Sequence, residues 1–320
     1  MSARRPPAAH RGGVMASKVA FVTGASRGIG KAVAIELARL GYDVAVTART
    51  VNAGEQREHS STISATDVSP LPGSLSETAA LIEKEGQKAL AVPADLLDQA
   101  SLGAAVATVL ERWGRIDLIV HNGRYIGPGH MDRFLDTPIE LLERQLEANV
   151  IAPLVLNRIV LPRMIEQGGG IVVNITSASG YGDPTEPAGA GGWGMGYGIS
   201  KGAFQRIAGF LAVELRDQGI RCYNVQPGLI ATERIGQDMA KFGIANNGAP
   251  PEVVARVVGW LATSDEAPSF NGKTIEAQFF CHDRKLLDGW DGPRPTKNNI
   301  SYDDAAANLT AYESRWQKEG

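Results

Sequence analysis

Short apolar runs alternate along the chain with longer segments in which apolar residues recur at helical spacing. Seven of the short runs are predicted strands, with six helical segments between them: Val19–Val22, Asp43–Thr47, Ala89–Val92, Leu118–Val120, Ile171–Ile175, Arg221–Val225 and Thr274–Ala277. This alternation is typical of a parallel sheet that helices cover on both faces. The sequence therefore predicts an α/β fold, a single domain with a Rossmann-type, doubly wound, parallel seven-stranded sheet.

Several predicted helices carry end signals of their own. The first helix is expected to end at Gly41, because glycine readily adopts the left-handed conformation that closes a helix. Ser74 and Glu77 form a capping box for a helix that is expected to end near Gly86.

Three segments fall outside the regular alternation. Val51–Gly73 is polar and has little periodicity, so we expect a surface insertion beside the adenine end of a nucleotide site. Residues 1–16 lack the apolar stretch of a secretory signal and are predicted to be a disordered N-terminal tail. The main domain then covers residues 17–282. Residues 283–320 form a C-terminal extension with aromatic residues that need burial.

Composition narrows the class of protein. The chain has 320 residues, 43% of them hydrophobic, which is enough for the full core of one large domain. Its net charge of −3 does not indicate a partner that is a nucleic acid or a membrane surface, and no apolar run approaches membrane-spanning length. Cys222 and Cys281 have no metal-type spacing and favour a reducing, cytoplasmic location.

The turn after the first predicted strand holds a glycine motif of the kind that binds a dinucleotide. The motif consists of Thr23, Gly24, Ser26, Arg27, Gly28, Ile29 and Gly30. Gly24 permits a tight turn, Gly28 lets the backbone approach a pyrophosphate, and Gly30 lets the helix pack closely on the sheet. The helix N-terminus adds amide donors and a partial positive charge. A purely structural strand-to-helix turn is the alternative.

The residues near the end of the second strand indicate which nicotinamide cofactor binds. A site selective for NAD usually has a carboxylate about 20 residues past the glycines, where it binds the ribose 2′-hydroxyl. This chain has Ala48 and Arg49 there, and Arg27 lies inside the glycine loop. Two guanidinium groups without a carboxylate favour a 2′-phosphate, so NADP(H) is predicted and NAD(H) is possible. The alternative is that both arginines are solvated surface charges.

A second motif indicates proton chemistry. Tyr197 is followed four positions later by Lys201, and a phenol and an ammonium at that spacing share one face of a helix. Ser177 follows the fifth predicted strand, twenty residues before Tyr197. The alternatives are a packed helix aromatic with a surface lysine, and an ordinary turn serine.

Together these residues resemble the short-chain dehydrogenase/reductase family, roughly from Ser17 to Phe280. Further residues in the family's order are Asp95, Leu96, Asn149, Pro227, Gly228 and Thr232. The resemblance implies that Asp95 and Leu96 contact the adenine, and that the Pro227–Gly228 pair and Thr232 line the nicotinamide amide. It also implies that Ile230–Pro250 is a mobile loop over the substrate; an ordinary surface connection is the alternative.

The resemblance assigns four catalytic roles. Tyr197 would donate a proton to a carbonyl during reduction, or accept one during alcohol oxidation. Lys201 would stabilise the Tyr197 phenolate by its charge and hold the nicotinamide ribose. Ser177 would hydrogen-bond the substrate oxygen, and Asn149 would position a water that relays protons to Lys201.

The chain departs from the family pattern after the fourth strand. The family usually has Asn-Asn-Ala-Gly there, whereas this chain has His121, Asn122, Gly123 and Arg124. Asn122 keeps its place, and both Asn122 and Gly123 are expected beside the cofactor. Either Gly123 lets the backbone shift to accommodate Arg124, which we favour, or Arg124 faces the site and favours an acidic group on the substrate.

The second departure is a long interval, residues 178–196, between Ser177 and Tyr197. An enlarged loop there would reshape the substrate site, so no relative's substrate can be transferred to this chain. His130 and His282 are not expected to be catalytic, because nothing near them in the sequence forms a metal or nucleophile constellation.

The sequence as a whole predicts an NADP(H)-dependent oxidoreductase that transfers a hydride between nicotinamide and a ketone or secondary alcohol. The substrate is expected to be apolar: lipid-like, steroid-like, acyl or terpenoid. A non-catalytic NADP(H)-binding sensor or scaffold is the alternative. The resemblance also implies a homotetramer or homodimer, paired through the helices around residues 141–164 and 197–216.

Overall fold

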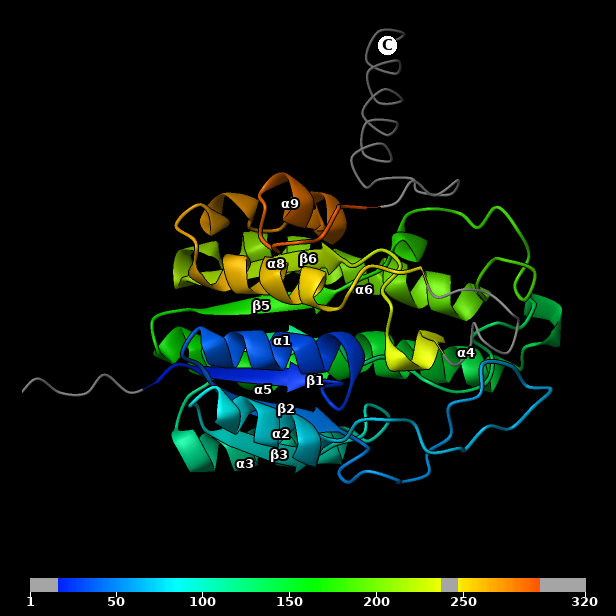
Figure 1. The fold of residues 1–320 in the computed structure, drawn as a ribbon, viewed down its shortest axis with the longest axis horizontal. Coiled ribbons are helices and arrows are strands. Elements are labelled where there is room, and N and C mark those ends of the chain that lie inside the picture. The colour runs from blue at the N-terminus through cyan, green and yellow to red at the C-terminus, as the bar shows by residue number, and fades with distance from the viewer. Residues whose placement is uncertain (1–16, 237–246, 294–320) are drawn as a thin grey trace, which may run out of the picture.

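The computed structural model describes residues 17–236 and 247–293, and it contains one seven-stranded parallel sheet (Figure 1). The strand order is β3-β2-β1-β4-β5-β6-β7. The strands are β1 Val19–Thr23, β2 Asp43–Ala48, β3 Ala89–Pro93, β4 Leu118–His121, β5 Gly170–Ile175, β6 Ile220–Gln226 and β7 Thr274–Glu276. Each predicted strand is present, with its ends shifted by no more than one residue, so the predicted fold is confirmed.

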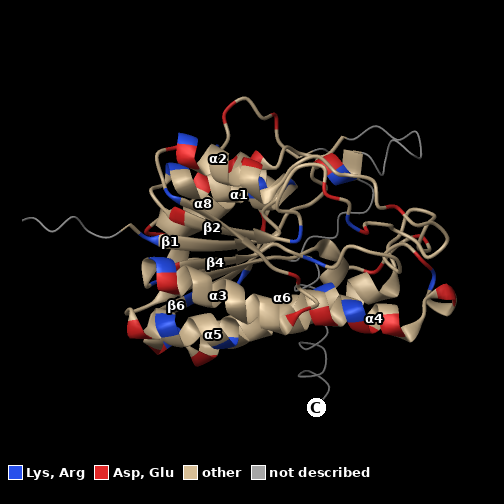
Figure 2. Cartoon of the chain, turned by 90° about the horizontal axis from the view of Figure 1, so that it is seen from below, with Lys and Arg blue, Asp and Glu red and all other residues tan. Residues whose placement is uncertain are grey.

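The helices form a layer on each face of the sheet (Figure 2). One layer contains α1 Gly28–Arg39, α2 Leu75–Lys84 and α8 Glu252–Thr263, and the other contains α3 Gln99–Trp113, α5 Ala152–Glu166 and α6 Met195–Glu214. The remaining elements are α4 Ile139–Leu146, α9 Ala277–Asp283, the π-helical turn η2 Glu147–Ile151 and the 3₁₀ turns η1 Phe134–Asp136, η3 Ala178–Gly180, η4 Arg216–Gln218 and η5 Ala267–Phe270. The chain thus covers both faces, as a doubly wound sheet requires.

Two apolar clusters, one on each face, hold these layers together. In β1, Ala20 and Val22 pack toward α1 and α8, whereas Val19 and Phe21 pack toward α3 and α5. Because both faces of the strand are buried, the predicted strands show continuous apolar runs rather than an alternation of apolar and polar residues.

The predicted helix ends are confirmed in detail. Gly41 has φ +87° directly after α1, and Gly86 has the same φ after α2. At the start of α2, the Ser74 side chain accepts a hydrogen bond from the Glu77 amide at 3.1 Å. Glycine adopts positive φ at little cost, so local sequence determines where these helices stop.

One helical stretch corrects the expectation about membrane-spanning length. Helices α4 and α5 are joined by η2 into a stretch of 28 residues, Ile139–Glu166, with a mean hydropathy of 1.3 over its most apolar window. By length and composition alone this stretch could cross a membrane. Half of that window is buried inside the protein, as in the core helix of a globular domain.

The sequence predicts the insertion at residues 51–73 beside the adenine end of the nucleotide site, but the insertion extends farther than that. It starts after β2 and runs along the edge formed by the carboxyl ends of the strands (Figure 1). Ser61 accepts a backbone hydrogen bond from Met131 at 2.9 Å, and the Ile63 amide donates to Asp132 at 3.0 Å. The insertion returns to the glycine loop at its other end, where Gly73 packs against Ser26.

Part of the C-terminal extension packs on the main domain. Leu286, Leu287 and Trp290 lie against the apolar cluster that contains α1 and α8. The Trp290 ring is also 6.4 Å from the His282 ring, edge to face. The first residues after α9 therefore complete this side of the core. Residues 237–246 of the predicted loop Ile230–Pro250 and residues 294–320 of the extension lie outside the described residues.

Candidate active site

The glycine loop lies at the carboxyl end of β1, where helix α1 begins. Gly24 has φ +64°, and a side chain there would lie 2.7 Å from the Cα of Gly123. A methyl group at residue 30 would overlap the carbonyl oxygen of Gly24 and lie 2.5 Å from Asn122 Nδ2. The first and last glycines are therefore required by backbone packing within the loop.

Thr23 and Asn122 join the glycine loop to the loop after β4. The Thr23 hydroxyl accepts hydrogen bonds from the amides of Asn122 and Gly123 at 3.0 and 2.9 Å. Asn122 Nδ2 donates to the carbonyls of Thr23 and Gly24, both at 3.0 Å. The side chains of Thr23 and Asn122 therefore hold the glycine loop against the loop after β4. Leu96 also packs against Gly123. Asp95, before it, accepts a hydrogen bond from the Leu97 amide at 3.0 Å.

The N-terminus of α1 holds a carboxylate, which shows that this end of the helix fits an anion. The Gly28 amide donates to Glu233 Oε2 at 2.9 Å, and Lys31 Nζ lies 2.6 Å from Glu233 Oε1. Burial alone would raise the pKa of Glu233, but hydrogen bonds from Lys31 and the backbone hold it below its ordinary value. Thr232 Cγ2 lies 3.0 Å from the position that a Cβ of residue 28 would take. An amide, a helix dipole and an ammonium are the groups that bind a dinucleotide pyrophosphate.

The two arginines considered for cofactor selectivity lie close enough to interact. Burial lowers the pKa of Arg27, Glu233 opposes this shift, and the neighbouring charge of Arg49 adds to it. Arg27 Nε and Nη2 donate to backbone carbonyls of residues 71–73, the shortest bond being 2.8 Å to Pro72. Arg49 Nη2 donates to the carbonyl of Glu58 at 3.3 Å. The insertion therefore fixes both guanidinium groups beside the glycine loop.

Lys201 is buried in α6, with 3% of its surface exposed. Its ammonium group donates a hydrogen bond to the carbonyl of Ile175, at the end of β5, at 2.9 Å. Burial, assisted by the positive charge of Arg124, lowers the pKa of Lys201 to about 7. The alternative of a surface lysine is therefore wrong. The charge of the buried Lys201 can act on neighbouring groups with little screening by solvent.

The turn after β5 brings Ser177 against the same part of α6. Ser177 Oγ accepts hydrogen bonds from the amide and the hydroxyl of Ser179 at 3.3 and 3.0 Å. These contacts leave the Ser177 hydroxyl proton for another acceptor. Gly180 packs on the Lys201 backbone, where an added Cβ would lie 2.9 Å from the Lys201 carbonyl carbon. The structure thus packs the turn that carries Ser177 against α6, the helix that carries Tyr197 and Lys201.

Asn149 lies in the π-helical turn η2, and both the oxygen and the nitrogen of its side-chain amide are hydrogen-bonded to the protein. Its Oδ1 accepts from the Tyr125 amide at 2.6 Å, and its Nδ2 donates to the Ser200 hydroxyl at 2.9 Å. The side chain therefore ties the loop after β4 to helix α6 beside Lys201. Irregular helical turns of this kind are frequent at functional sites. The water relay at Asn149 stays a prediction.

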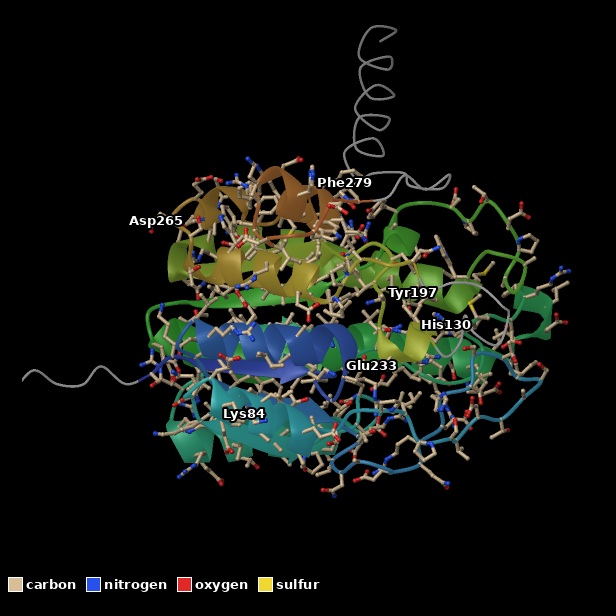
Figure 3. The ribbon with its side chains drawn as sticks, in the orientation of Figure 1. Lys84, His130, Tyr197, Glu233, Asp265 and Phe279 are labelled. Atoms are coloured by element: carbon tan, nitrogen blue, oxygen red, sulfur yellow. The ribbon has the colours of Figure 1, made fainter. Side chains whose placement is uncertain are left out.

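Two residues that sequence reasoning did not assign to catalysis flank Tyr197. The ring of His130 meets the Tyr197 ring edge to face, with 4.5 Å between centroids (Figure 3). The guanidinium carbon of Arg124 lies 5.7 Å from the Tyr197 ring centroid. Burial, followed by the charges of Arg124, Arg234 and Lys201, holds the pKa of His130 well below its ordinary value. No sequence signal placed His130 here, because the contact depends on how the loop after β4 folds back over α6.

The segment after β6 lies between α9 and the glycine loop. Gln278 Nε2 donates to the carbonyls of Pro227 and Leu229 at 3.0 and 3.1 Å, and Gly228 has φ +69°. In the enlarged loop, the Tyr181 hydroxyl hydrogen-bonds the Glu276 carboxylate. The ends of β5, β6 and β7 therefore border one site, with Tyr197, His130 and Glu233 at the same end of the molecule (Figure 3).

Comparisons with known proteins agree with this arrangement. The family model described as short chain dehydrogenase matches residues 18–73 and 63–241. An uncharacterized NAD-dependent oxidoreductase of Mycobacterium tuberculosis is 31% identical, over 83% of this chain and 96% of the relative. The 2-(R)-hydroxypropyl-CoM dehydrogenase of Xanthobacter autotrophicus is 34% identical, over 68% of this chain and 76% of the relative.

A solved structure shows the same likeness in three dimensions. The short chain dehydrogenase from Mycobacterium paratuberculosis bound to NAD is 27% identical, with a TM-score of 0.64. The match covers 81% of this chain and 95% of that structure. Sequence and structure comparisons thus agree on one family over most of the chain.

Proposed function

The chain belongs to the short-chain dehydrogenase family, and from that premise we propose that it transfers a hydride between NADP(H) and a ketone or secondary alcohol, with Tyr197 as general acid and base. Membership makes it an oxidoreductase that uses a nicotinamide cofactor. The observation that carries the catalytic proposal is the burial of Lys201, which lies in α6 one helical turn after Tyr197. Its ammonium group is held by a hydrogen bond to the carbonyl of Ile175, at the end of β5.

The residues divide the reaction between them. The nicotinamide, when bound, supplies or accepts the hydride. Tyr197 donates a proton to the carbonyl oxygen as negative charge develops on it, and in the reverse direction takes the proton from the alcohol. The Ser177 proton, which Ser179 leaves available, hydrogen-bonds the same oxygen. The Lys201 charge favours the phenolate form of Tyr197.

Deuterium transfer tests whether the reaction reduces a carbonyl carbon. NADPH deuterated at the transferable position should leave one deuterium at the former carbonyl carbon of the product. Ser177→Ala should slow this step by about 100-fold or more, because the variant loses a donor to the developing charge. Consumption of NADPH with no deuterium in the product would contradict the proposed chemistry.

The preference for NADP(H) is supported by the paired guanidinium groups of Arg27 and Arg49. Among the described residues, Arg27 Nη1 has no hydrogen-bond partner, and Arg49 donates only through Nη2. These free donors suit a phosphate bound in a fork geometry. The relative from Mycobacterium tuberculosis and the solved structure reported above are both described with NAD, so the proposal of NADP(H) rests on this chain's own arginines.

Equilibrium titration separates the two cofactors. Arg27→Ala and Arg49→Ala should each weaken NADPH binding by about 10-fold or more, as expected for loss of a charge-assisted hydrogen bond. Binding of NADH should change much less. Arg112→Ala, which alters an exposed arginine on α3, is the control. Wild-type binding of NADH at least as tight as that of NADPH would contradict the preference.

We also propose a homodimer or homotetramer, because apolar side chains remain exposed on the helices expected to pair. Phe210 and Val213 on α6 are 58% and 72% exposed, and Ile151 and Leu154 are partly exposed where η2 meets α5. Exposed apolar groups on adjacent helices are typical of subunit interfaces. Light scattering should give a multiple of the chain mass, and Phe210→Glu should reduce it. A wild-type monomer would refute the proposal.

A further inference from the structure

Arg124 is held directly against the proposed proton donor. It lies in the loop after β4, where its half-buried guanidinium is fixed by a hydrogen bond from Nη1 to the carbonyl of Tyr125 at 3.0 Å. From there its guanidinium carbon reaches to 5.7 Å from the Tyr197 ring centroid. Gly123, the preceding residue, packs against Gly24 and supplies the close backbone approach. Of the two alternatives considered from sequence, this contact supports the one in which Arg124 faces the site.

The electrostatic surroundings of Arg124 are unfavourable for a cation. Its charge lowers the pKa of both Lys201 and His130, in each case after the effect of burial. Among the described residues, no carboxylate forms an ion pair with Arg124. A partly buried guanidinium beside a buried ammonium, with no compensating anion, raises the energy of the protein without a ligand.

A second observation at the same place also points to a polar ligand. His130 Nδ1 is buried and has no hydrogen-bond partner among the described residues. Its ring is one of the groups that contact Tyr197, and an imidazole carries no negative charge that could pair with Arg124. Buried polar atoms usually have a partner, so an unpartnered nitrogen beside a guanidinium that has no ion pair among the described residues favours a bound polar group there.

We infer that the site takes a carbonyl or alcohol substrate that carries a carboxylate close to the reacting carbon, and that Arg124 binds this carboxylate. This inference rests on the proposed function, because it places the carbonyl at Tyr197. A guanidinium binds a carboxylate through two parallel hydrogen bonds, and the bound anion offsets the repulsion between Arg124 and Lys201. The expected substrate is then an apolar oxo acid or hydroxy acid rather than a neutral lipid.

Oxo acids and their methyl esters give the direct test. In a series of 2-, 3-, 4- and 5-oxo acids, each acid differs from its methyl ester by the negative charge and one methyl group. For at least one chain length, wild type should favour the acid over its ester by about 10- to 100-fold in kcat/KM, the range expected for a charge-assisted hydrogen bond. Arg124→Met should abolish that ratio, and Arg124→Lys should retain part of it.

A matched variant separates the effect of Arg124 from a general loss of positive charge. Arg133→Met removes an exposed arginine from the same loop region, and it should keep the acid-to-ester ratio of wild type. The inference is wrong if no acid in the series is preferred by wild type, or if Arg124→Met keeps the preference.

Binding to an inactive enzyme distinguishes failure of this inference from failure of the proposed function. Calorimetric titration of the same acids and esters into Tyr197→Phe loaded with NADP⁺ needs no turnover. Acids should bind more tightly than esters, and the additional substitution Arg124→Met should remove the difference. That result without any wild-type turnover would contradict the proposed reductase chemistry and support the anion site. Equal binding of acids and esters would overturn the inference.

The other anion that could reach Arg124 is a cofactor phosphate. Titration of NADPH into wild type and Arg124→Met separates the two sources. A carboxylate site predicts a cofactor dissociation constant that changes by less than about threefold. A large loss of NADPH affinity, with an unchanged acid-to-ester ratio, would assign the guanidinium to the cofactor and overturn the inference.

Discussion

Replacing Lys201 with methionine should change the pH dependence of stability, because the folded protein holds this ammonium group away from water. Lys201 is 3% exposed, and its pKa falls from an ordinary value of 10.5 to about 7. Folding therefore makes the proton easier to lose. Between these two pKa values the unfolded chain binds more protons than the folded one, so the free energy of unfolding rises with pH.

The size of the effect follows from the two pKa values. Below pH 7 Lys201 is protonated in both the folded and the unfolded chain, and its burial destabilises the folded protein to the full extent. This destabilisation is relieved as the pH rises toward 10.5. Between pH 6 and pH 9 the lowered pKa of Lys201 should raise the free energy of unfolding by about 2–3 kcal/mol. Lys201→Met removes this dependence, although it also leaves the Ile175 carbonyl without the hydrogen bond from Lys201, a cost that does not vary with pH.

Urea unfolding of the cofactor-free protein tests the prediction, because it measures the free energy of unfolding at each pH. Wild type and Lys201→Met are compared at fixed protein concentration across this pH range, because an oligomer's stability depends on its concentration. The stability of wild type relative to the variant should rise by about 2–3 kcal/mol from pH 6 to pH 9. Lys84→Met, which alters an exposed lysine at the end of α2, should show no such trend. A flat difference for Lys201→Met would refute the reasoning.

Two further predictions concern the glycine loop. Glu233→Gln removes the negative charge at Gly28 and Lys31, where a pyrophosphate would bind, so NADPH should bind about 3- to 10-fold more tightly by fluorescence titration; weaker binding would show that Glu233 supports the cofactor instead. Gly30→Ala should lower the free energy of unfolding by about 1–3 kcal/mol because its methyl group meets the Gly24 carbonyl. Gly103→Ala, at an uncrowded position in α3, should instead stabilise by up to about 1 kcal/mol in the same urea experiment; equal effects would contradict the packing argument.

Strands, helix ends and the proposed catalytic pair of Tyr197 and Lys201 were predictable because their signals are local. β1 alternates its buried residues between two helical layers, and Gly41 and Ser74 determine helix boundaries within a few residues of themselves. The four-residue spacing of Tyr197 and Lys201 needs only a helix to bring both to one face.

The remaining features depend on contacts between distant segments. The polar insertion at residues 51–73 has no periodicity, so nothing in it indicated the hydrogen bonds to Met131 and Asp132. Glu233 binds the N-terminus of α1 although it lies 205 residues after Gly28 in the sequence. His130 approaches Tyr197 only because the loop after β4 folds over α6. Such tertiary contacts leave no pattern in a single sequence.

The most direct test of the account is NADPH oxidation by wild type and Tyr197→Phe, at matched folding, with ketones, aldehydes and quinones as substrates. The account predicts that wild type reduces a ketone, and that Tyr197→Phe loses about 100-fold or more of the rate while still binding NADPH, because it lacks the proton donor. Turnover of the same ketone by Tyr197→Phe at the wild-type rate would contradict the assignment of Tyr197. Tight NADPH binding without turnover by wild type would favour a sensor or scaffold.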